Sequence, residues 1–584
     1  MSPTSPVPQT PECAFPLVII DDTQRSADED KADSIFDDNL DEAMSAAVDA
    51  LEAIQERRRI ANERYRLVDE IMLPLTKSGS KFISFGVRPF KNFEAAVKIH
   101  NPQLTAAVIF DDEEYDDFVK KLARESFFGG RTNASQLYYK CRPGEKIKYY
   151  DVCSLYPYVN KYGKYPVGHP VKLYVHPNDC NQIDLQNFEG LVKCTVLPPQ
   201  DLYHPVLPYR CNGKLTFPLC RSCVETECQR ECSHQISDRQ FTGTYVADEL
   251  RKAIEKQYKV VNISEAWEYK VVQYDRDSKS GGLFSEYVNN FLKIKQECSG
   301  WPSWCVSELE KDRYIDLYRE REGIILDKQK ICKNAGLRFV SKIMLNSFWG
   351  KFGQRENAQQ TQFIHDPCEL FKMVTNPSLI VNNLTIVNDD VLMANWERVE
   401  EDIALLKSVN VAIAAYTTAS ARLELYKYLE QLDRRVLYYD TDSIFFISEY
   451  DGQLEPPTGD FLGDLTDEMA EYGDGSYIAE FVSGGPKNYA YKFWKASENT
   501  YDTVCKVKGI TLHYANSQKV NFEALKTMIL ENPTVSLQIS DKAIIRNKRY
   551  DVLTKNAHKT YGMSYTKRRR IQGSFDTLPY GYRT

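Results

Sequence analysis

Residues Val436–Phe446 read Val-Leu-Tyr-Tyr-Asp-Thr-Asp-Ser-Ile-Phe-Phe. Two apolar, β-prone segments flank a four-residue polar turn, and this pattern predicts an antiparallel hairpin. The turn places Asp440 and Asp442 at its tip, where small hydroxyl residues alternate with them. Crowding two like charges is costly unless a divalent cation neutralises them, so the hairpin indicates a metal site. The alternative is a surface hairpin with an acidic turn.

A further carboxylate stands at the end of another β-prone run. Residues 148–150, Lys-Tyr-Tyr, predict a strand that ends at Asp151. A carboxylate at a strand end is held rigidly and can still reach a cleft, which suits a Mg²⁺ ligand. Pro157 is expected to turn the chain, so that residues 154–156 cap the strand instead of extending it.

The segment Arg338–Lys351 predicts a helix with one cationic stripe. Steps of four place a set of polar or small residues on one face, namely Arg338, Lys342, Asn346 and Gly350. Such a stripe can bind a triphosphate, with Lys342 as a point charge and Gly350 leaving room for a base pair. The alternative is a partly exposed helix whose basic face is hydrated.

Together and in this order, the three segments resemble motifs A, B and C of the family B DNA polymerases. The matching patterns are Asp-x-x-Ser-Leu-Tyr-Pro from Asp151, Lys-x-x-x-Asn-Ser-x-x-Gly from Lys342 and Tyr-x-Asp-Thr-Asp-Ser from Tyr438. Each pattern fixes several positions, so a chance match to all three in order is negligible beside the usual risk of one motif.

Other segments resemble the protein-primed branch of that family, which includes small bacteriophages, adenoviruses and Maverick (Polinton) transposons. Phe127–Gly130 is similar to a Tyr-x-Gly-Gly turn with Phe in place of Tyr. Lys487–Tyr489 is similar to a Lys-x-Tyr motif, and Lys506–Gly509 follows at a suitable spacing. Phe291–Trp301 looks most like the Maverick type, and the resemblance spans residues 125–584.

The resemblance implies two-metal nucleotidyl transfer from dNTPs to the 3′-hydroxyl of a DNA primer on a template. The implied catalytic residues are Asp151, Asp440 and Asp442. Two Mg²⁺ ions, for which Mn²⁺ could substitute, would be bound by Asp151, Asp442 and the backbone carbonyl of Val152. The implied nucleotide-binding residues are Ser154, Leu155, Tyr156, Arg338, Lys342, Asn346 and Gly350. The implied primer–template residues are Gly129, Gly130, Tyr439, Thr441, Lys487, Tyr489, Lys506 and Lys508.

Two aromatic residues bear on the choice of nucleotide. The resemblance implies that Tyr156 lies under the sugar and fills the space that a 2′-hydroxyl needs, which makes dNTPs the expected substrate. Trp349 stands where the family usually has Tyr, so the contact with the incoming base departs from the family pattern.

A cysteine-rich stretch lies between motifs A and B. The chain has 15 cysteines, and five of them fall between Cys211 and Cys232. The Cys-x-x-Cys and Cys-x-His spacings suggest a tetrahedral Zn²⁺ site, and the candidate ligands are Cys220, Cys223, Cys228, Cys232 and His234. The alternative is a set of reduced thiols packed in a β-rich region. Protein-primed relatives insert a segment here that contacts a terminal protein primer, which makes such a primer an expected partner.

The resemblance implies an α+β multidomain fold: a right hand with an antiparallel palm, helical fingers, a thumb and an inserted cysteine-rich module. The expected divisions are a disordered acidic leader (1–40), a short α/β region (41–125), turn and palm (126–165), insertion (166–285), fingers (286–353), second insertion (354–405), palm (406–508) and thumb (509–584). Only 126 residues precede Phe127, so no intact proofreading exonuclease is expected. We expect the last 75 residues to be mostly helical.

The charge is distributed unevenly along the chain. The net charge is −8, but residues 487–584 carry 18 basic and 7 acidic side chains. Such an asymmetry suits a chain with one face on a polyanion, and the alternative is a solvated basic face. The run Lys567–Arg570 could also be a nuclear import signal. No apolar run is long enough for a membrane span, so we expect a soluble intracellular protein without a membrane partner.

Two competing functions remain. The first is an inactive, truncated copy that only binds DNA, although the joint presence of Asp151, Asp440 and Asp442 argues against decay. The second is an RNA-dependent polymerase with a similar palm, which the Asp-Thr-Asp-Ser pattern and the motif B helix disfavour. Extension of a primer on a DNA template separates these functions.

Overall fold

The computed structural model describes residues 122–173, 183–355, 357–388, 390–399, 409–449, 455–531, 536–546, 552–563 and 565–583. The chain divides into the units Met1–Lys81 and Phe82–Thr584, and every described residue belongs to the second unit. The predicted leader 1–40 and nearly all of the predicted region 41–125 lie outside the described residues.

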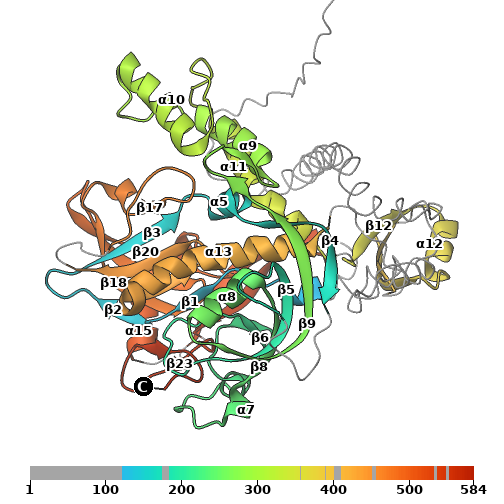
Figure 1. Cartoon of the computed structure of the whole chain (residues 1–584). Helices are drawn as coiled ribbons and strands as arrows, with labels where there is room; N and C mark the ends of the chain where they lie inside the picture. Colours follow the sequence, from blue (N-terminus) through green and yellow to red (C-terminus); the bar gives the residue numbers. More distant parts are fainter. Residues whose placement is uncertain are drawn as a thin grey trace, which may run out of the picture. The chain divides into compact units, whose positions relative to one another are not determined.

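The largest sheet among the described residues has nine strands, all paired antiparallel (Figure 1). Its central order is β1-β15-β16-β3-β18-β19-β20, with β17 on β3 and β2 on β18. The strands are β1 (Thr132–Ala134), β2 (Tyr138–Lys140), β3 (Lys146–Val152), β15 (Val436–Asp440), β16 (Ser443–Ser448), β17 (Leu465–Asp467), β18 (Tyr477–Gly485), β19 (Asn488–Lys495) and β20 (Thr500–Val507). The predicted hairpin is therefore present, and β3 lies beside it.

The two faces of this sheet belong to different hydrophobic cores because successive side chains of a strand point in opposite directions. Tyr439 and Ile444 pack in one core with residues of α13 (Val411–Leu432), which lies along the sheet in Figure 1. Tyr438 and Phe445 pack in the other core with residues of α15 (Phe522–Leu530).

Helices follow the strands that carry the motifs. They are α5 (Leu155–Tyr162), α9 (Ser285–Glu297), α10 (Glu308–Glu322) and α11 (Ala335–Phe352). The expectation that Pro157 turns the chain was wrong: Pro157 lies in the first turn of α5, where its missing N–H costs no hydrogen bond. The buried ammonium of Lys161 lies 3.0 Å from Glu322 Oε2 and ties α5 to the end of α10.

The segment after α5 forms a four-stranded antiparallel sheet with short helices. Its order is β4 (Tyr165–Leu173), β9 (Lys259–Val272), β5 (Gly190–Leu197) and β8 (Phe241–Val246). The smaller elements are β6 (Tyr209–Cys211), β7 (Lys214–Thr216), α6 (Arg221–Glu225), α7 (Ile236–Arg239), α8 (Ala247–Glu255), β10 (Tyr274–Asp275) and β11 (Ser280–Gly281).

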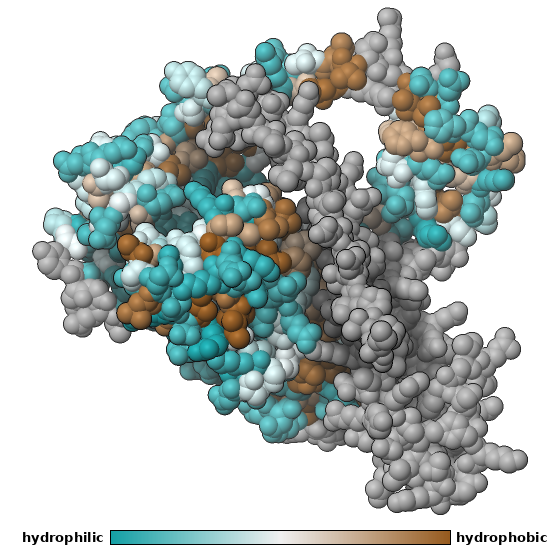
Figure 2. Space-filling model, turned by 90° about the horizontal axis from the view of Figure 1, so that it is seen from above, coloured by the Kyte–Doolittle hydropathy of each residue, from teal (hydrophilic) through white to brown (hydrophobic). Residues whose placement is uncertain are grey.

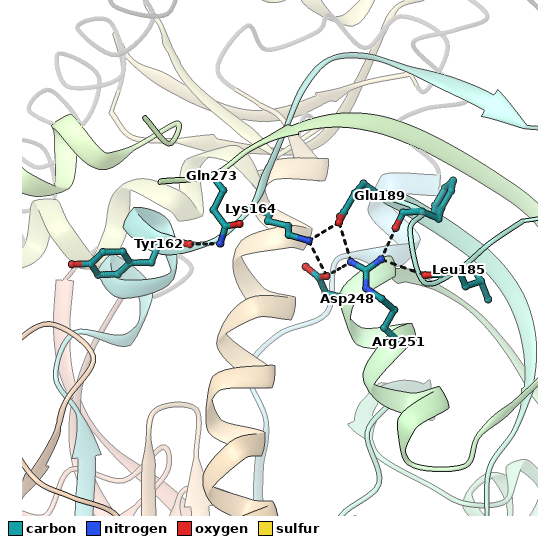
Figure 3. A network of polar contacts seen from close by, with 8 residues as sticks. Tyr162, Lys164, Leu185, Glu189, Asp248, Arg251 and Gln273 are labelled. Atoms are coloured by element: carbon teal, nitrogen blue, oxygen red, sulfur yellow. Dashed lines mark hydrogen bonds and ion pairs between the residues drawn. The ribbon is translucent and has the colours of Figure 1, made fainter. Parts of the chain in front are cut away.

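A polar network holds that sheet to its neighbours (Figure 3). Lys164 lies 2.5 Å from Glu189 Oε1 and 3.8 Å from Asp248 Oδ1. Arg251 of α8 pairs with the same two carboxylates and also donates to the backbone carbonyl of Leu185. Since two cations share two anions, the start of β4, the start of β5 and α8 are fixed together.

A separate small sheet follows α11. It consists of β12 (Gln360–Ile364), β14 (Leu392–Arg398) and β13 (Leu379–Ile386), with α12 (Pro367–Val374) beside it. This sheet occupies most of the predicted second insertion 354–405, and residues 400–405 lie outside the described residues.

The prediction of a mostly helical C-terminus was wrong. After α14 (Tyr514–Ser517) and α15, the described residues form the long hairpin of β21 (Ser536–Arg546) and β22 (Val552–Gly562), then β23 (Arg569–Arg570) and β24 (Thr577–Leu578). Leu537 and Ile539 alternate with polar residues, and both pack in the α15 core. The alternation of apolar and polar residues predicts a strand here, and the many basic residues had obscured this pattern.

Among the residues that the structure describes, no helix is both long and apolar enough to cross a bilayer. On the face drawn in Figure 2, hydrophilic side chains cover much of the coloured surface and apolar ones gather in separate patches. Exposed apolar side chains include Leu337, Phe339 and Val340 near the start of α11.

Candidate active site

The hairpin turn and β3 bring Asp151 and Asp442 together. Ser443 pairs with Asp151 in the sheet register, and the Val152 N–H donates to the Asp442 carbonyl at 2.8 Å. The predicted four-residue turn is shorter in the structure, since Asp440 pairs with Ser443 and only Thr441 and Asp442 form the turn. Thr441 adopts a left-handed φ of 60°, a strained conformation for a β-branched residue.

Burial and mutual repulsion perturb both carboxyls. Burial, followed by the charges of Asp442 and Glu468, raises the pKa of Asp151 to about 8. Burial also raises the pKa of Asp442 to about 6, and Asp440 and Glu468 add to this effect. No ion pair to Asp151, Asp442 or Glu468 occurs among the described residues. Two interacting carboxyls without an ion-pair partner, with Glu468 close enough to act on their charge, suit a divalent cation.

Sequence reasoning missed Glu468. It follows β17, which pairs with β3, and its N–H donates to the Tyr149 carbonyl at 2.9 Å. The hydroxyl of Thr466 donates to the Asp151 carbonyl at 3.1 Å. Burial raises the pKa of Glu468 as well. The one available signal was the acidic stretch 464–471, which has no distinctive spacing.

Asp440 differs from the other acids because its charge is already satisfied. Thr132 donates to Asp440 Oδ1 at 2.7 Å, and Lys487 Nζ lies 3.0 Å from Oδ2. Lys487 has a left-handed φ of 59°, and its N–H donates to the Tyr438 hydroxyl at 2.8 Å. The Asp440–Lys487 pair therefore fixes the relation of the hairpin to the turn between β18 and β19.

Three cations, Lys295, Arg338 and Lys342, lie close enough to one another to interact, and Lys342 also interacts with Asp151. Lys295 Nζ of α9 donates to Ser154 Oγ at 3.2 Å, and Ser154 precedes α5 with a left-handed φ of 54°. Burial lowers the pKa of Lys295, as do the charges of Arg338 and Lys342 on α11. Lys342 in turn favours ionisation of Asp151. Lys342 of the predicted stripe is thus close enough to Asp151 to act on its charge, whereas Arg338 donates to Ser299 Oγ at 3.0 Å. Lys295, which the stripe analysis missed, lies near both cations.

The predicted nucleotide residues differ in accessibility. The ring of Tyr156 stacks on Trp349 with centroids 4.4 Å apart. Gly350 is exposed, and a Cβ there would meet no atom within 4 Å, so the surface beside it is open. Leu155 and Tyr439 are buried in the α13 core, so any contact they make with a ligand must come from the backbone.

A basic groove leads away from Asp440. It has a volume of about 260 Å³ and is lined by Asp440, Lys487, Tyr489, Lys506, Val507 and Lys508. An adjoining groove of about 530 Å³ shares Lys508 and adds Lys559 of β22. The predicted primer–template lysines therefore line two grooves that share Lys508, one of which includes the C-terminal hairpin.

The predicted Gly-Gly turn lies against the acidic hairpin. A Cβ at Gly130 would lie 2.8 Å from Thr441 Oγ1, whereas one at Gly129 would meet nothing within 4 Å. Arg422 of α13 holds the turn by donating to the carbonyls of Phe128 at 2.7 Å and Gly129 at 3.0 Å.

The cysteine-rich stretch brings four of its five predicted ligands together. The ligand atoms of Cys220, Cys223, Cys232 and His234 all lie within 4.8 Å of one another. His234 Nδ1 is 3.5 Å, 3.3 Å and 3.7 Å from the respective sulfurs. A tetrahedral Zn²⁺ site separates sulfur from nitrogen by about 3.5 Å, so the group fits this ion. Cys228 is not a member, and its sulfur lies 3.9 Å from the Arg230 carbonyl.

The basic run Lys567–Arg570 is part of the fold. Arg568 is buried, and its guanidinium donates to the carbonyls of Tyr203 at 3.2 Å and Thr577 at 3.0 Å. Arg569 and Arg570 form β23. The run is therefore not a free basic tail.

Comparison with known proteins gives consistent matches. The family described as DNA polymerase type B, organellar and viral, matches residues 98–301 and 312–434. A probable DNA polymerase of Neurospora intermedia is 23% identical over 424 residues, which are 70% of this chain and 34% of that protein. One of Podospora anserina is 23% identical over 498 residues, 79% of this chain and 33% of that protein. The chain spans about a third of the length of these curated relatives.

Two solved structures of one polymerase also align with this chain. Phi29 DNA polymerase complexed with primer-template DNA and incoming nucleotide substrates superposes with a TM-score of 0.46 and 15% identity. The alignment covers 85% of this chain and 71% of that one. The same polymerase complexed with primer-template DNA alone gives a TM-score of 0.46 and 14% identity, with the same shares covered.

Proposed function

The chain belongs to the organellar and viral type B DNA polymerases, and we propose that it adds dNTPs to the 3′-hydroxyl of a primer on a DNA template. The family match confirms the resemblance, and the matched residues include motifs A and B but end before motif C. The observation that carries the proposal is the meeting of Asp151 and Asp442 between a cationic helix face and a basic groove.

The acidic centre is the proposed site for two Mg²⁺ ions, for which Mn²⁺ could substitute. Asp151, Asp442 and the Val152 carbonyl would hold them, and Glu468 is near enough to contribute charge. When bound, the ions would lower the pKa of the primer hydroxyl and offset charge on the leaving pyrophosphate. The raised pKa values of the metal-free carboxyls support this assignment, because burial and neighbouring carboxyls disfavour their ionised form, which a bound cation would favour.

The cations Lys295, Arg338 and Lys342 would bind the triphosphate of the incoming dNTP. Lys342 and Arg338 present their charges from α11, and Lys295 fixes the Ser154 hydroxyl beside them. Tyr156 would lie under the sugar and exclude a 2′-hydroxyl. Its stacking on Trp349 supports this role. The ring of Tyr156 extends from α5 and packs on α11, so it has little freedom to move aside.

The basic groove would hold the primer end. Lys487, Lys506 and Lys508 line it, with Tyr489 between them. Lys487 is already paired with Asp440, so it would meet the primer phosphate from a fixed position. The contacts are to the sugar–phosphate backbone, which makes binding independent of sequence and sensitive to salt.

In terms of a right hand, the nine-stranded sheet would be the palm, α9–α11 the fingers and residues 509–584 the thumb. The insertion 166–285 would contact a terminal protein primer in a viral or Maverick-like replication system. The Cys3His group within it would hold a structural Zn²⁺. Residues 354–405 would be a second insertion. A nuclear location remains a prediction.

Primer extension on a DNA template with Mg²⁺ and dNTPs tests the proposal. We expect extension by the wild type and by the control Asp502→Asn, a change in edge strand β20. We expect no extension by Asp442→Asn. If neither the wild type nor the control extends a primer but both bind duplex DNA at low salt, the chain is a DNA-binding module and the catalytic proposal fails.

A further inference from the structure

The Cys3His group lies directly against the C-terminal segment, which is here residues 565–583. Tyr580 is buried in one cluster with Cys220, Cys223 and Cys232. The Leu219 N–H donates to the Tyr580 carbonyl at 2.7 Å. The backbone of the next residue touches a ligand, because a Cβ at Gly581 would lie 2.5 Å from the Cβ of Cys220.

Further hydrogen bonds join the loops that carry the ligands to the same segment. Arg583 Nε donates to the Cys232 carbonyl, and the Arg583 N–H donates to Gln200. The side chain of Gln229 contacts the Tyr580 hydroxyl at 3.4 Å and accepts from the Arg570 N–H at 2.9 Å. The ligand loops and the last residues of the chain therefore form one packed unit.

This unit has little structure of its own. Helices α6 and α7 have five and four residues, and β6 and β7 have three each. Elements this short seldom hold together without a cross-link, and a bound metal supplies one. The ligands come from the N-cap of α6, from its first turn and from the stretch before α7, so one ion would join both helices.

The C-terminal segment also supports the groove beside Asp440. Tyr565 donates to the Ala134 carbonyl at 2.7 Å, and the Thr577 N–H donates to the Ser135 carbonyl at 2.9 Å, so the segment lines β1. β1 carries Thr132, which donates to Asp440. Lys567 Nζ lies 3.5 Å from the Thr132 carbonyl and is close enough to Asp440 and Lys487 to interact with their charges.

We propose that a Zn²⁺ ion held by Cys220, Cys223, Cys232 and His234 fastens Thr577–Arg583, the end of the C-terminal segment. This fastening keeps Lys567 and β1 in place at the primer-end groove. The fastening is a property of the fold alone, whereas its effect on primer binding rests on the proposed function. The ion would act through position, since the Cys3His group takes no part in the acidic centre.

Zinc content and hydrogen exchange test the fastening without any activity assay. In reducing buffer we expect one zinc per chain in the wild type and in Cys228→Ser, a matched control in the same loop. Cys232→Ser should lose the zinc. Exchange of peptides covering residues 565–583 should then rise in that variant and in the chelated wild type, and should stay low in Cys228→Ser. Absence of zinc from the wild type, or unchanged exchange after its removal, overturns the proposal.

A second variant leaves every ligand intact. Gly581 has a φ of 93°, so Gly581→Ala should displace the segment both by strain and by the contact with Cys220. We expect it to retain zinc, to exchange faster over residues 565–583, and to lower the salt slope of primer–template binding by about 1, as for one lost phosphate contact. An unchanged slope with faster exchange refutes the link to the groove. A chain with zinc-dependent protection but no primer extension would instead refute the polymerase function.

Discussion

The rings of Tyr156 and Trp349 are stacked, with centroids 4.4 Å apart and planes inclined by 21°. Tyr156 belongs to α5, which follows the strand of Asp151, and Trp349 belongs to the cationic helix α11. The contact therefore joins the two elements that would enclose the incoming nucleotide. Trp349 occupies the position where we expected a departure from the family pattern, and its ring stacks on Tyr156.

Replacing Trp349 should weaken the selection of the sugar. In Trp349→Ala the ring of Tyr156 loses its support and gains freedom to rotate. Aromatic pairs contribute about 0.5–1.5 kcal/mol, so the preference for dNTP over rNTP should fall by about two- to tenfold. Ratios of kcat/KM for the two nucleotides measure this preference. Trp349→Phe keeps a stacked ring and serves as the control; equal preferences in wild type and Trp349→Ala would refute the role.

Removing one carboxylate should stabilise the metal-free protein. The pKa of Asp151 is raised in the folded state, so its contribution to stability is fully present below its ordinary pKa and is lost as pH rises toward about 8. Asp151→Asn should therefore raise Tm in EDTA by roughly 2–4 °C for each kcal/mol of relieved repulsion, and more at pH 8 than at pH 5.

The same carboxyls should make metal binding depend on pH. Mg²⁺ must displace the proton of Asp151, so the rise in Tm on adding Mg²⁺ should grow between pH 6 and pH 8. Differential scanning calorimetry with EDTA or Mg²⁺ measures both effects, with Asp502→Asn as the control. A Mg²⁺ shift that persists in the double variant Asp151→Asn/Asp442→Asn would place the metal elsewhere.

The neighbouring glycines of the turn before β1 should respond differently to alanine. A Cβ at Gly130 would lie 2.8 Å from Thr441 Oγ1, in a hairpin turn that is already strained. Gly130→Ala should cost about 1–3 kcal/mol in the free energy of unfolding and reduce primer extension. Gly129→Ala should change neither, because nothing lies within 4 Å of the added carbon. Denaturant titration of both variants, with extension assays, decides the point; equal losses would mean that the contact with Thr441 is unimportant.

The acidic centre could be predicted because each part has a local pattern. Alternation and a polar turn predict the hairpin of Asp440 and Asp442, and an apolar run ending in an acid predicts β3. The helix predicted for the cationic stripe is present as α11, which contains all four stripe residues. No local sequence pattern of this kind indicated Glu468 or Lys295 as a site residue. Each is a single charge whose importance comes from pairing of β17 with β3 or from packing of α9 on α11.

The prediction of a mostly helical C-terminus was wrong for a different reason. Its many lysines and arginines suggested a basic helical surface, while the alternation of Leu537 and Ile539 received too little weight. The burial of Arg568 could not be predicted either, since its carbonyl partners lie in residues far away in sequence, such as Tyr203. The cysteines were the opposite case, because their spacing alone indicated five candidate ligands, and the fold brings four of them together.

Lys295 should contribute to nucleotide binding through Ser154. Its ammonium donates to Ser154 Oγ at 3.2 Å and adds charge beside Arg338 and Lys342. A hydrogen bond from a charged group is worth about 1.5–3 kcal/mol, so Lys295→Ala should raise KM for dNTPs by roughly tenfold or more. Lys293→Ala is the matched control, because Lys293 lies on the same helix and pairs instead with Glu297 at 3.8 Å. Steady-state kinetics on a primed template should show the increase only in the first variant.

The same lysine should give nucleotide affinity a distinctive pH dependence. Burial and the neighbouring cations lower the pKa of Lys295, so it loses its charge at a lower pH than an ordinary lysine. The affinity of the wild type for dNTPs should therefore decline as pH rises toward 10, before ordinary lysines titrate. Lys295→Arg keeps the charge throughout this range and should remove the decline. If the arginine variant and the wild type show the same pH profile, the charge at this position has no part in binding, and Ser154 is held for structural reasons alone.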